Sequence, residues 1–367
     1  MYSSLQKAIN AAASGDTVTV LENITLAEPV TVAADDKIVL DLNGKTVTGK
    51  PTESAAYAVI INKGDLTIQD SGSNGKIVCN HTLEGSTSYA VNTILNAGTL
   101  TVEGGSIENT STASNQIGYA IDNNSTSANA VLTVSGGSIS ATGSNYYDAI
   151  RQFCNSTTME NSVTVSGGSV SSIWMQNPSD GSVKNTKDVK GSVTVRGGNV
   201  LGLYVEPSLA FAAEVSGGTI GTLDYFQTAE GRDLTGFVTG GTFTNKPDDA
   251  FAAEGYQFKK NDNGTYSVVE KTYVAEVGGE KFYDLQAAID AAGEGDTVVI
   301  LDSFTMDYSV TVAAGDKLTL DLNGKTVTGL DEAASASFNL IVNKGDLTIN
   351  DTVGGGKITL AASNAAS

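Results

Sequence analysis

The stretch Thr133-Val134-Ser135-Gly136-Gly137-Ser138-Ile139 is one copy of a short phrase that recurs between residues 100 and 245. Each copy contains alternating apolar and polar residues, a pair of glycines and a second short alternating run. The first glycines of the six pairs are Gly104, Gly136, Gly167, Gly197, Gly217 and Gly240, which lie 32, 31, 30, 20 and 23 residues apart. A period of two is typical of β-strands and paired glycines of tight corners, so each phrase predicts a strand, a corner and a strand.

The spacing of the phrases indicates how these strands are connected. A turn of 20 to 32 residues is too long for a hexapeptide solenoid and fits three strands per rung with loops of varying length. Stacked rungs would pair their backbones in parallel at a spacing of about 4.8 Å, and Val, Ile and Leu side chains would form columns inside the coil. We therefore predict an all-β fold, a right-handed parallel β-helix.

A second repeat has a much longer period. Residues 40–49 return letter for letter as residues 320–329, and Leu5-Gln6 returns 280 residues later as Leu285-Gln286. We interpret the chain as one long unit followed by the beginning of a second, as in a longer tandem array.

The two repeats together predict three segments. Residues 1–245 are expected to form a parallel β-helix with a capping helix near residues 4–14, residues 246–283 a β-hairpin that connects or caps, and residues 284–367 a truncated second β-helix with a capping helix near residues 284–293. The first helix is expected because Leu5 and Ile9 lie on one face and Ser4 can cap its first turn. The hairpin is expected around the turn signal Asn263-Gly264.

The end of the second β-helix leads to an expectation about association. We expect the last strand, near residues 357–360, to be a frayed or reactive edge, because an edge strand carries unpaired backbone groups. We expect the protein to be a monomer that can make end-to-end contact with another copy at this rung.

The net charge excludes several classes of partner. Asp and Glu total 41 against 21 Lys and Arg, which gives a net charge of −20 and predicts repulsion of nucleic acids and anionic membranes. No run approaches the roughly 18 apolar residues that cross a bilayer, so we expect no membrane insertion in this segment. The single histidine, His81, is expected to be packed or solvated, and Cys79 and Cys154 to be free core thiols. We expect no cofactor and no metal site.

A further strand precedes the Gly-Gly phrases, and its outward side chains are the candidate binding residues. We align its third column as apolar and facing the core, with Val59, Val91, Ile121, Ile150, Met175, Val205 and Phe226. Alternation then turns the second column outward, where Ala58, Ala90, Ala120 and Ala149 line up with Trp174, Tyr204 and Tyr225. The fourth column also faces outward and contains Asn92, Asp122, Arg151, Gln176, Glu206 and Gln227.

This surface has two interpretations. A ridge of aromatic rings beside amides and carboxylates can stack on sugar rings or anchor a protein partner, and its binding candidates are Trp174, Tyr204, Tyr225, Arg151, Asp122, Gln176 and Glu206. The same rings can instead stack on one another as a ladder that stabilises the sheet. Asp122 and Arg151 fall on adjacent rungs, where an exposed ion pair would contribute at most about 1 kcal/mol.

Several motifs resemble a known family. Four features are similar to pectate-lyase-like right-handed parallel β-helix modules of large adhesin-like cell-surface proteins of Gram-positive gut commensals. They are the opening pattern at residues 5–18, the block at residues 40–45, the Gly-Gly phrases and the closing pattern at residues 255–268. The resemblance covers nearly the whole chain. It implies a secreted tandem-repeat protein that is extracellular and attached to the cell surface through regions outside this segment.

Three functions remain open at this point. The leading expectation is a non-catalytic adhesin or binding module that engages a glycan or a host extracellular protein through a lateral face of the β-helix. The alternative is a polysaccharide lyase or glycoside hydrolase acting on acidic polysaccharide with Asp122, Arg151 and Glu206, which the negative charge of the chain disfavours. No set of catalytic residues is recognised, since the repeated phrases carry isolated charges. The third function is a purely structural stalk.

Overall fold

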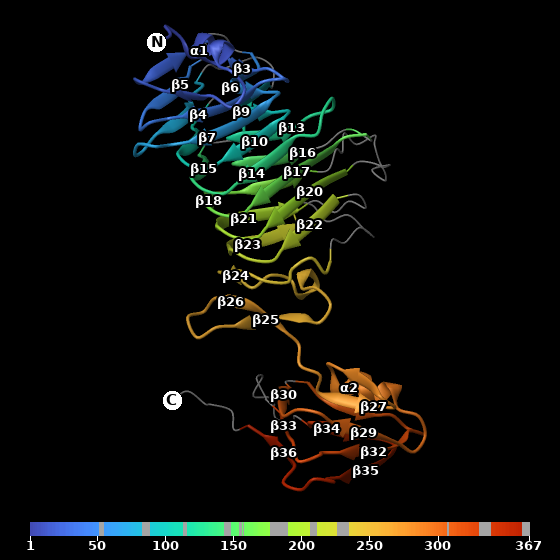
Figure 1. Cartoon of the computed structure of the whole chain (residues 1–367). Coiled ribbons are helices and arrows are strands. Elements are labelled where there is room, and N and C mark those ends of the chain that lie inside the picture. The colour runs from blue at the N-terminus through green and yellow to red at the C-terminus, as the bar shows by residue number, and fades with distance from the viewer. Residues whose placement is uncertain are drawn as a thin grey trace. The chain divides into compact units, whose positions relative to one another are not determined.

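The computed structural model describes residues 1–50, 55–82, 89–112, 116–142, 148–153, 156, 158–176, 190–205, 211–225, 235–306, 308–329 and 339–361 (Figure 1). The chain divides into two compact units, Met1–Val269 and Glu270–Ser367. The predicted fold class is confirmed, because the chain winds into a right-handed parallel β-solenoid of about 9 turns. Among the described residues, no helix is long and apolar enough to cross a bilayer.

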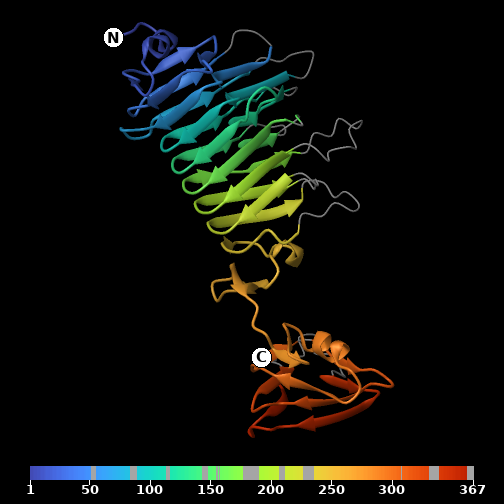
Figure 2. The same ribbon diagram turned by 45° about the vertical axis from the view of Figure 1, so that its right-hand side comes forward.

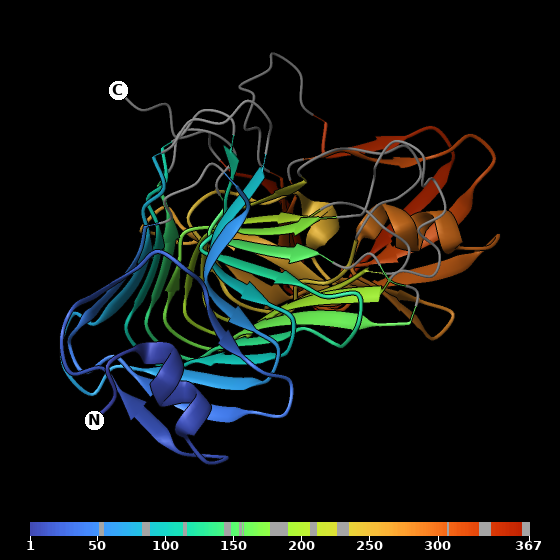
Figure 3. The same cartoon turned by 90° about the horizontal axis from the view of Figure 1, so that it is seen from above.

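The first unit begins with the short helix that the sequence predicts. Helix α1 (Leu5–Ala11) starts where the Ser4 hydroxyl accepts a hydrogen bond from the Lys7 amide at 3.3 Å. Leu5 and Ile9 are buried on its inner face, and the helix lies across the first rungs of the coil (Figure 3). An amphipathic helix in this position covers apolar side chains that would otherwise contact water.

Three parallel sheets form the walls of the first unit, and successive strands of each sheet lie one above the other (Figure 2). The first sheet contains β1 (Thr17–Thr19), β4 (Lys37–Asp41), β7 (Asp65–Gln69), β10 (Thr99–Val102), β14 (Val131–Val134), β17 (Glu160–Val165), β20 (Lys190–Val195) and β22 (Phe211–Val215). Its register aligns Leu40, Ile68, Val102, Val134, Val165, Val195 and Val215 in one fully buried column. This column confirms the apolar interior expected from the alternating phrases.

The other two sheets share their last strands. The second contains β2 (Ile24–Leu26), β5 (Thr46–Gly49), β8 (Lys76–Cys79), β11 (Ser106–Asn109), β15 (Ser138–Ala141), β18 (Ser169–Val170), β21 (Asn199–Val205), β23 (Thr219–Tyr225) and β24 (Thr242–Phe243). The third contains β3 (Val30–Val32), β6 (Tyr57–Asn62), β9 (Tyr89–Asn96), β13 (Ile121–Asn124), β16 (Ile150–Phe153), β19 (Ile173–Gln176) and the later residues of β21 and β23. The short strand β12 (Gln116–Ile117) pairs with the start of β9.

The Gly-Gly corners join the first sheet to the second, and each glycine is required for a different reason. The second glycine of a pair adopts a left-handed backbone, as at Gly137 with φ 71°, which side chains with a Cβ rarely adopt. The first glycine lies against the rung before it, because a Cβ on Gly136 would be 2.1 Å from the carbonyl oxygen of Glu103. The repeated glycine pair therefore meets two requirements: a left-handed turn conformation and a close backbone contact between rungs.

The register of the third sheet differs from the alignment predicted from the sequence. Tyr57 pairs with Val91 rather than with Tyr89, and Met175 pairs with Gln152 rather than with Ile150. One core-facing column is Ile60, Ile94, Ile121, Ile150, Ile173, Leu203 and Leu223. The described residues that were predicted to face the core are all fully buried, as expected, but they do not share one column: Val59, Val91, Ile121, Ile150, Met175 and Val205. The alignment was wrong because β6 and β9 contain four consecutive buried residues each, so alternation of hydrophobicity does not mark a face there.

One interior column of the third sheet is polar, which the sequence analysis did not anticipate. It consists of fully buried amides linked by side-chain hydrogen bonds: Asn62 to Asn96 at 2.8 Å, Asn96 to Asn123 at 2.7 Å and Asn123 to Gln152 at 2.6 Å. Met175 and Val205 continue the same column. Because a buried amide without a partner is costly, each hydrogen bond ties the register of one rung to the next.

A hairpin closes the first unit. Strands β25 (Tyr256–Lys260) and β26 (Tyr266–Glu270) flank a turn in which the Asn261 amide donates to the Thr265 carbonyl at 2.8 Å. Strand β26 pairs antiparallel with β24, and the rings of Phe243 and Phe258 lie 5.3 Å apart. The hairpin therefore caps the first β-helix, and the predicted connector 246–283 is shared between the two units.

The second unit repeats the start of the first. Its elements are β27 (Ala275–Val277), β28 (Glu280–Phe282), α2 (Leu285–Ala291), β29 (Asp296–Ile300), β30 (Phe304–Met306), β31 (Val310–Val312), β32 (Lys317–Asp321), β33 (Thr326–Gly329), β34 (Ile341–Asn343), β35 (Asp346–Asn350) and β36 (Lys357–Leu360). They form sheets in the orders β28-β27-β29-β32-β35, β30-β33-β36 and β31-β34. The predicted start of a second β-helix is confirmed, and helix α2 precedes its first parallel strands.

Candidate functional site

One outward column of the third sheet contains most of the predicted binding residues. Backbone pairing places Asp122 opposite Arg151, Arg151 opposite Trp174, Trp174 opposite Tyr204 and Tyr204 opposite Asp224. The sequence analysis assigned Trp174 and Tyr204 to one outward column and Arg151 to another. The structure brings these side chains into one line on consecutive rungs, which we call the lateral column (residues 122, 151, 174 and 204).

The ion pair at the start of the lateral column is buried rather than exposed. Arg151 donates from Nε to one oxygen of Asp122 at 2.8 Å and from Nη2 to the other oxygen at 2.6 Å. The Asp122 side chain is 3% exposed and the Arg151 side chain 17% exposed. The amide of Asn92 also contacts Asp122, at 3.4 Å. The expectation of an exposed pair was wrong, because the neighbouring rungs place Tyr119 and Asn92 against these charges.

Two aromatic rings hold the Arg151 guanidinium in place. Its central carbon lies 4.7 Å from the centroid of the Tyr119 ring and 4.9 Å from that of Phe153. Burial alone would lower the pKa of Arg151, but the Asp122 carboxylate outweighs burial and raises that pKa. Burial raises the pKa of Tyr119, so its phenol is neutral. The guanidinium is consequently a permanent cation in a fixed orientation.

The polar and aromatic side chains next to Arg151 are partly open to solvent. Arg151 Nη1 donates to Gln176 Oε1 at 3.3 Å, and the rings of Tyr119 and Trp174 lie 6.4 Å apart. Trp174, Gln176 and Tyr204 are each half-buried. A half-buried ring exposes one edge or face that can contact a ligand, while the rest of the side chain packs on the protein.

Tyr204 packs over a glycine of its own strand. A Cβ on Gly202 would lie 2.7 Å from the Tyr204 ring. The absence of a side chain at position 202 therefore gives the ring room to lie along strand β21. The alignment of Tyr204 with Trp174 was predicted from the sequence, whereas the role of Gly202 was not.

Tyr225 does not belong to the lateral column. It pairs with Val205 rather than with Tyr204, and its ring lies 4.8 Å from that of Phe251 within the core cluster. A shift of one residue reverses which face a side chain takes, so the predicted alignment put Tyr225 on the wrong side of the strand. Glu206, Phe226 and Gln227 lie outside the described residues.

The predicted alanine floor is also absent from the surface. Ala120 and Ala149 are fully buried and Ala58 is 4% exposed. Asn92 and Asp122, which were expected to flank this floor on the outside, are buried as well. The candidate surface is therefore confined to the rungs of Arg151, Trp174 and Tyr204.

Three contributing residues were not among the predicted binding residues. Tyr119 and Phe153 sandwich Arg151, and burial raises the pKa of the nearby Asp148 carboxyl. The parallel quartets Tyr119-Ala120-Ile121-Asp122 and Asp148-Ala149-Ile150-Arg151 are the signal that could have identified Tyr119 and Asp148, because these quartets occupy equivalent positions on adjacent rungs.

The lateral column supports binding chemistry more readily than proton transfer. Both oxygens of Asp122 accept hydrogen bonds from Arg151, so this carboxylate is committed to the ion pair and is a poor general base. No group of three or more His, Cys, Asp or Glu in the described part of the chain is placed to hold a metal ion. The lateral column offers a ligand the rings of Trp174 and Tyr204 and the fixed guanidinium of Arg151. The neighbouring Gln176 adds a side-chain amide.

The remaining single histidine and cysteines were also assigned from the sequence. His81 is buried, with its ring edge-on to Tyr89 at 5.6 Å between centroids, so its packed role is confirmed. Cys79 is a buried free thiol, also as predicted. Cys154 lies outside the described residues.

Comparison with known proteins adds no assignment. No protein-family model matches the chain, and neither curated proteins nor solved structures give a match. The β-helix fold expected from the family resemblance is present.

Proposed function

We propose that the first unit is a non-catalytic glycan-binding module of a tandem-repeat surface adhesin, and that it binds through the lateral column. The observation that carries this proposal is the alignment of half-buried Trp174 and Tyr204 on adjacent rungs beside the fixed Arg151 guanidinium. A glycan is favoured over a host extracellular protein because the site combines aromatic faces with polar donors. Extracellular location and attachment outside this segment belong to the same proposal.

Each part of the column has a physical role in this proposal. The rings of Trp174 and Tyr204 stack on the apolar faces of sugar rings. Their backbones lie on adjacent parallel strands, which are spaced by about 4.8 Å. Gln176 and Arg151 supply polar groups that orient the sugar hydroxyls or a sugar carboxylate. Arg151 needs little reorganisation on binding, since Tyr119, Phe153 and Asp122 already hold it.

The enzyme alternative has less support from the geometry. A lyase or hydrolase using Asp122 would require the carboxylate to leave a bidentate ion pair that is largely buried. The net charge of −20 also opposes the approach of a polyanionic substrate. In a purely structural stalk, the same rings would serve as a stacked ladder that stabilises the sheet.

The test is glycan-array binding by the full chain, followed by titration of the best glycan. Trp174→Ala and Tyr204→Ala should each weaken binding by about 10-fold or more, because an aromatic contact at the centre of a binding site is typically worth more than 1 kcal/mol. Leu201→Ala is the matched control, since Leu201 lies on the same strand as Tyr204 and is 55% exposed. Its affinity should equal that of the parent chain.

Other outcomes would contradict the proposal in distinct ways. Binding to a host extracellular protein that is lost in Trp174→Ala, with no glycan bound, would make this a protein-binding surface. Release of unsaturated or reducing ends from acidic polysaccharides would make the protein an enzyme. Absence of any ligand that responds to either substitution would leave a structural stalk.

A further inference from the structure

The two units start with equivalent elements, but only one has its first strand covered. Residues 15–20 of the first unit, Gly-Asp-Thr-Val-Thr-Val, correspond to residues 295–300 of the second, Gly-Asp-Thr-Val-Val-Ile. In both units a seven-residue helix precedes this strand. The units can therefore be compared position by position at this edge.

In the second unit, the hairpin formed by β27 and β28 covers the outer edge of β29. Strand β27 pairs antiparallel with β29, with Ala275 opposite Ile300 and Glu276 opposite Val299. The Leu301 amide donates to the Val274 carbonyl at 2.9 Å. Strand β28 pairs with the other edge of β27, so the hairpin both extends the sheet and shields it.

Side chains of the hairpin fill the space between the strand and the helix. Val274, Ala275 and Val277 are 8%, 0% and 4% exposed. They belong to the same core cluster as Ala288 of α2 and Val298 of β29. The alternation of inward apolar residues with the outward Glu276 suits a strand that has one face against a core.

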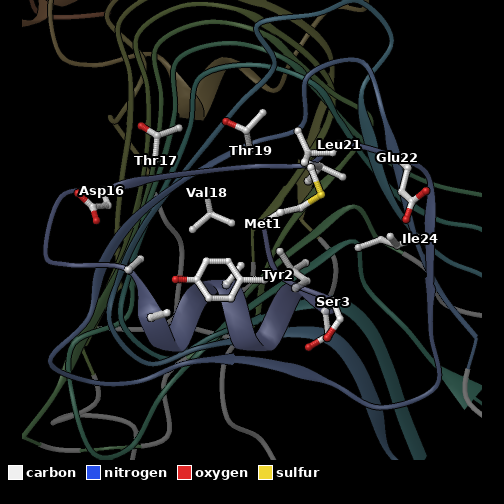
Figure 4. Close-up of a pocket in the computed structure, with 16 residues that line it drawn as sticks. Met1, Tyr2, Ser3, Asp16, Thr17, Val18, Thr19, Leu21, Glu22 and Ile24 are labelled. Carbon is white, nitrogen blue, oxygen red and sulfur yellow. The ribbon is translucent and has the colours of Figure 1, made fainter.

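In the first unit, the equivalent place is an open groove. Within the described residues, β1 pairs only with β4. A groove of about 470 Å³ lies between β1 and α1 (Figure 4). Its lining combines apolar residues, which include Leu5, Ala8, Val18, Val20 and Leu21, with the polar residues Asp16, Thr17, Thr19 and Glu22. Met1 and Tyr2 lie over it in Figure 4 but cover it loosely, since Tyr2 is 58% exposed.

Residues at matched positions are more deeply buried in the second unit, where the hairpin covers them, than in the first. Ala288 and Val298 of the second unit are fully buried, whereas the corresponding Ala8 is half-buried and Val18 is 8% exposed. Leu21, which corresponds to Leu301, is 58% exposed. The groove is partly apolar and borders a strand edge that has no partner strand among the described residues. Such an edge is the usual template for addition of another strand.

We propose that this groove binds a copy of the hairpin segment 271–283, as a strand antiparallel to β1. The inserted segment would place residues equivalent to Val274, Ala275 and Val277 on the core face. Its carbonyl at the Val274 position would accept a hydrogen bond from the Leu21 amide. In a tandem array, such a segment would connect one β-helix unit to the next. This proposal is independent of the glycan-binding function.

The first test adds the segment as a separate molecule. A synthetic peptide of residues 271–283 is titrated against the full chain, and hydrogen exchange of residues 17–21 is measured at each concentration. The peptide should slow exchange at these amides by about 10-fold or more at saturation, because paired edge amides open less often. A peptide with Ala275→Asp and Val277→Asp should have no effect, since both charges would be buried.

A substitution in the groove provides the matched control on the chain. Ala8→Arg fills the groove from α1 and should abolish the effect of the peptide, whereas Asn10→Arg, on the exposed side of the same helix, should leave it unchanged. The fluorescence of Trp174, the single tryptophan, verifies that both variants keep the native fold of the first unit.

The second test supplies the segment within the chain, because binding in trans can be weak. Residues 271–282 are fused directly before Ser3 in place of Met1 and Tyr2, which preserves the spacing between hairpin and helix seen in the second unit. Amide exchange of residues 17–21 should slow to the level of residues 297–301. The fusion that carries Ala275→Asp and Val277→Asp in the added segment should leave this exchange rate unchanged.

Three results would overturn the proposal. The first is an unchanged exchange rate at β1 with both the peptide and the fusion. The second is equal protection of β1 and of the open edge β36, which would mean unspecific pairing. The third is concentration-dependent protection of β1 in the unmodified chain, which would identify a second copy of β1 as the occupant.

Discussion

The same ten residues occur in both units, at 40–49 and 320–329, and they adopt the same local structure. Asn43 and Asn323 have φ angles of 48° and 49°. The preceding aspartates, Asp41 and Asp321, each accept a hydrogen bond at 2.9 Å from the amide of these asparagines. The turn is thus determined by nearby residues, since it is unchanged when the surrounding rungs differ.

The following rungs are similar in sequence and differ in burial. Ile68 is fully buried, whereas its counterpart Ile349 is 51% exposed. Cys79 is fully buried, whereas its counterpart Leu360 is 54% exposed. The cause is stacking: β7 pairs with strands on both sides, while β35 pairs only with β32 among the described residues. An apolar side chain in a β-helix therefore depends on the next rung for much of its burial.

The largest expected contrast is between Ile68→Ala and Ile349→Ala. Removal of the buried Ile68 side chain should lower the free energy of unfolding of the first unit by about 2–5 kcal/mol, while Ile349→Ala should cost the second unit about 1 kcal/mol or less. Urea unfolding with pulsed hydrogen exchange and mass spectrometry measures the stability of each unit separately, because each unit yields its own peptides. Equal losses in the two units would show that burial in this chain does not depend on the next rung.

A second contrast concerns backbone protection. Strand β8 lies between β5 and β11, whereas β36 pairs only with β33 in the described chain. Amides of Lys357–Leu360 should exchange faster than those of Lys76–Cys79 by about 100-fold, because an edge strand opens without breaking a second ladder. Native-state exchange with mass spectrometry measures both segments in one experiment, and equal protection would contradict the expectation of a reactive edge.

The smallest contrast is a pH effect at Cys79, whose counterpart Leu360 does not titrate. Burial raises the pKa of the Cys79 thiol from 9.0 to about 12, so the folded state keeps it neutral while the unfolded chain ionises above pH 9. The free energy of unfolding should therefore fall as pH rises between about 9 and 12, by about 1 kcal/mol at pH 10. Cys79→Val should remove this part of the alkaline loss.

Measurement of unfolding at pH 7, 9 and 10 separates this effect from other alkaline losses. The parent chain and Cys79→Val should show the same pH dependence below pH 8 and should diverge above pH 9. Burial also raises the pKa of Tyr57 and Tyr119, so both proteins lose some stability at high pH. Parallel curves up to pH 10 would mean that the folded state tolerates the thiolate.

The candidate site could be predicted in part. Trp174 and Tyr204 were correctly aligned, and each follows the first glycine of a Gly-Gly pair, Gly167 or Gly197, by seven residues. Arg151 was correctly paired with Asp122, yet its place in line with Trp174 was missed. The missing information was the register of the third sheet, which the amide ladder from Asn62 to Gln152 sets and which alternation does not reveal where both faces of a strand are buried.

The amino-acid sequence alone determines the corners, the capping helices and the parallel coil, because these depend on requirements of adjacent residues. Gly137 must adopt a positive φ, Ser4 must cap a helix, and alternating apolar residues must face inward. Only the tertiary structure decides register, burial and exposed edges. These properties depend on which rung lies next to which, as the buried Asp122 and the open edge of β1 both demonstrate. Contacts between rungs join residues that are 20 or more positions apart.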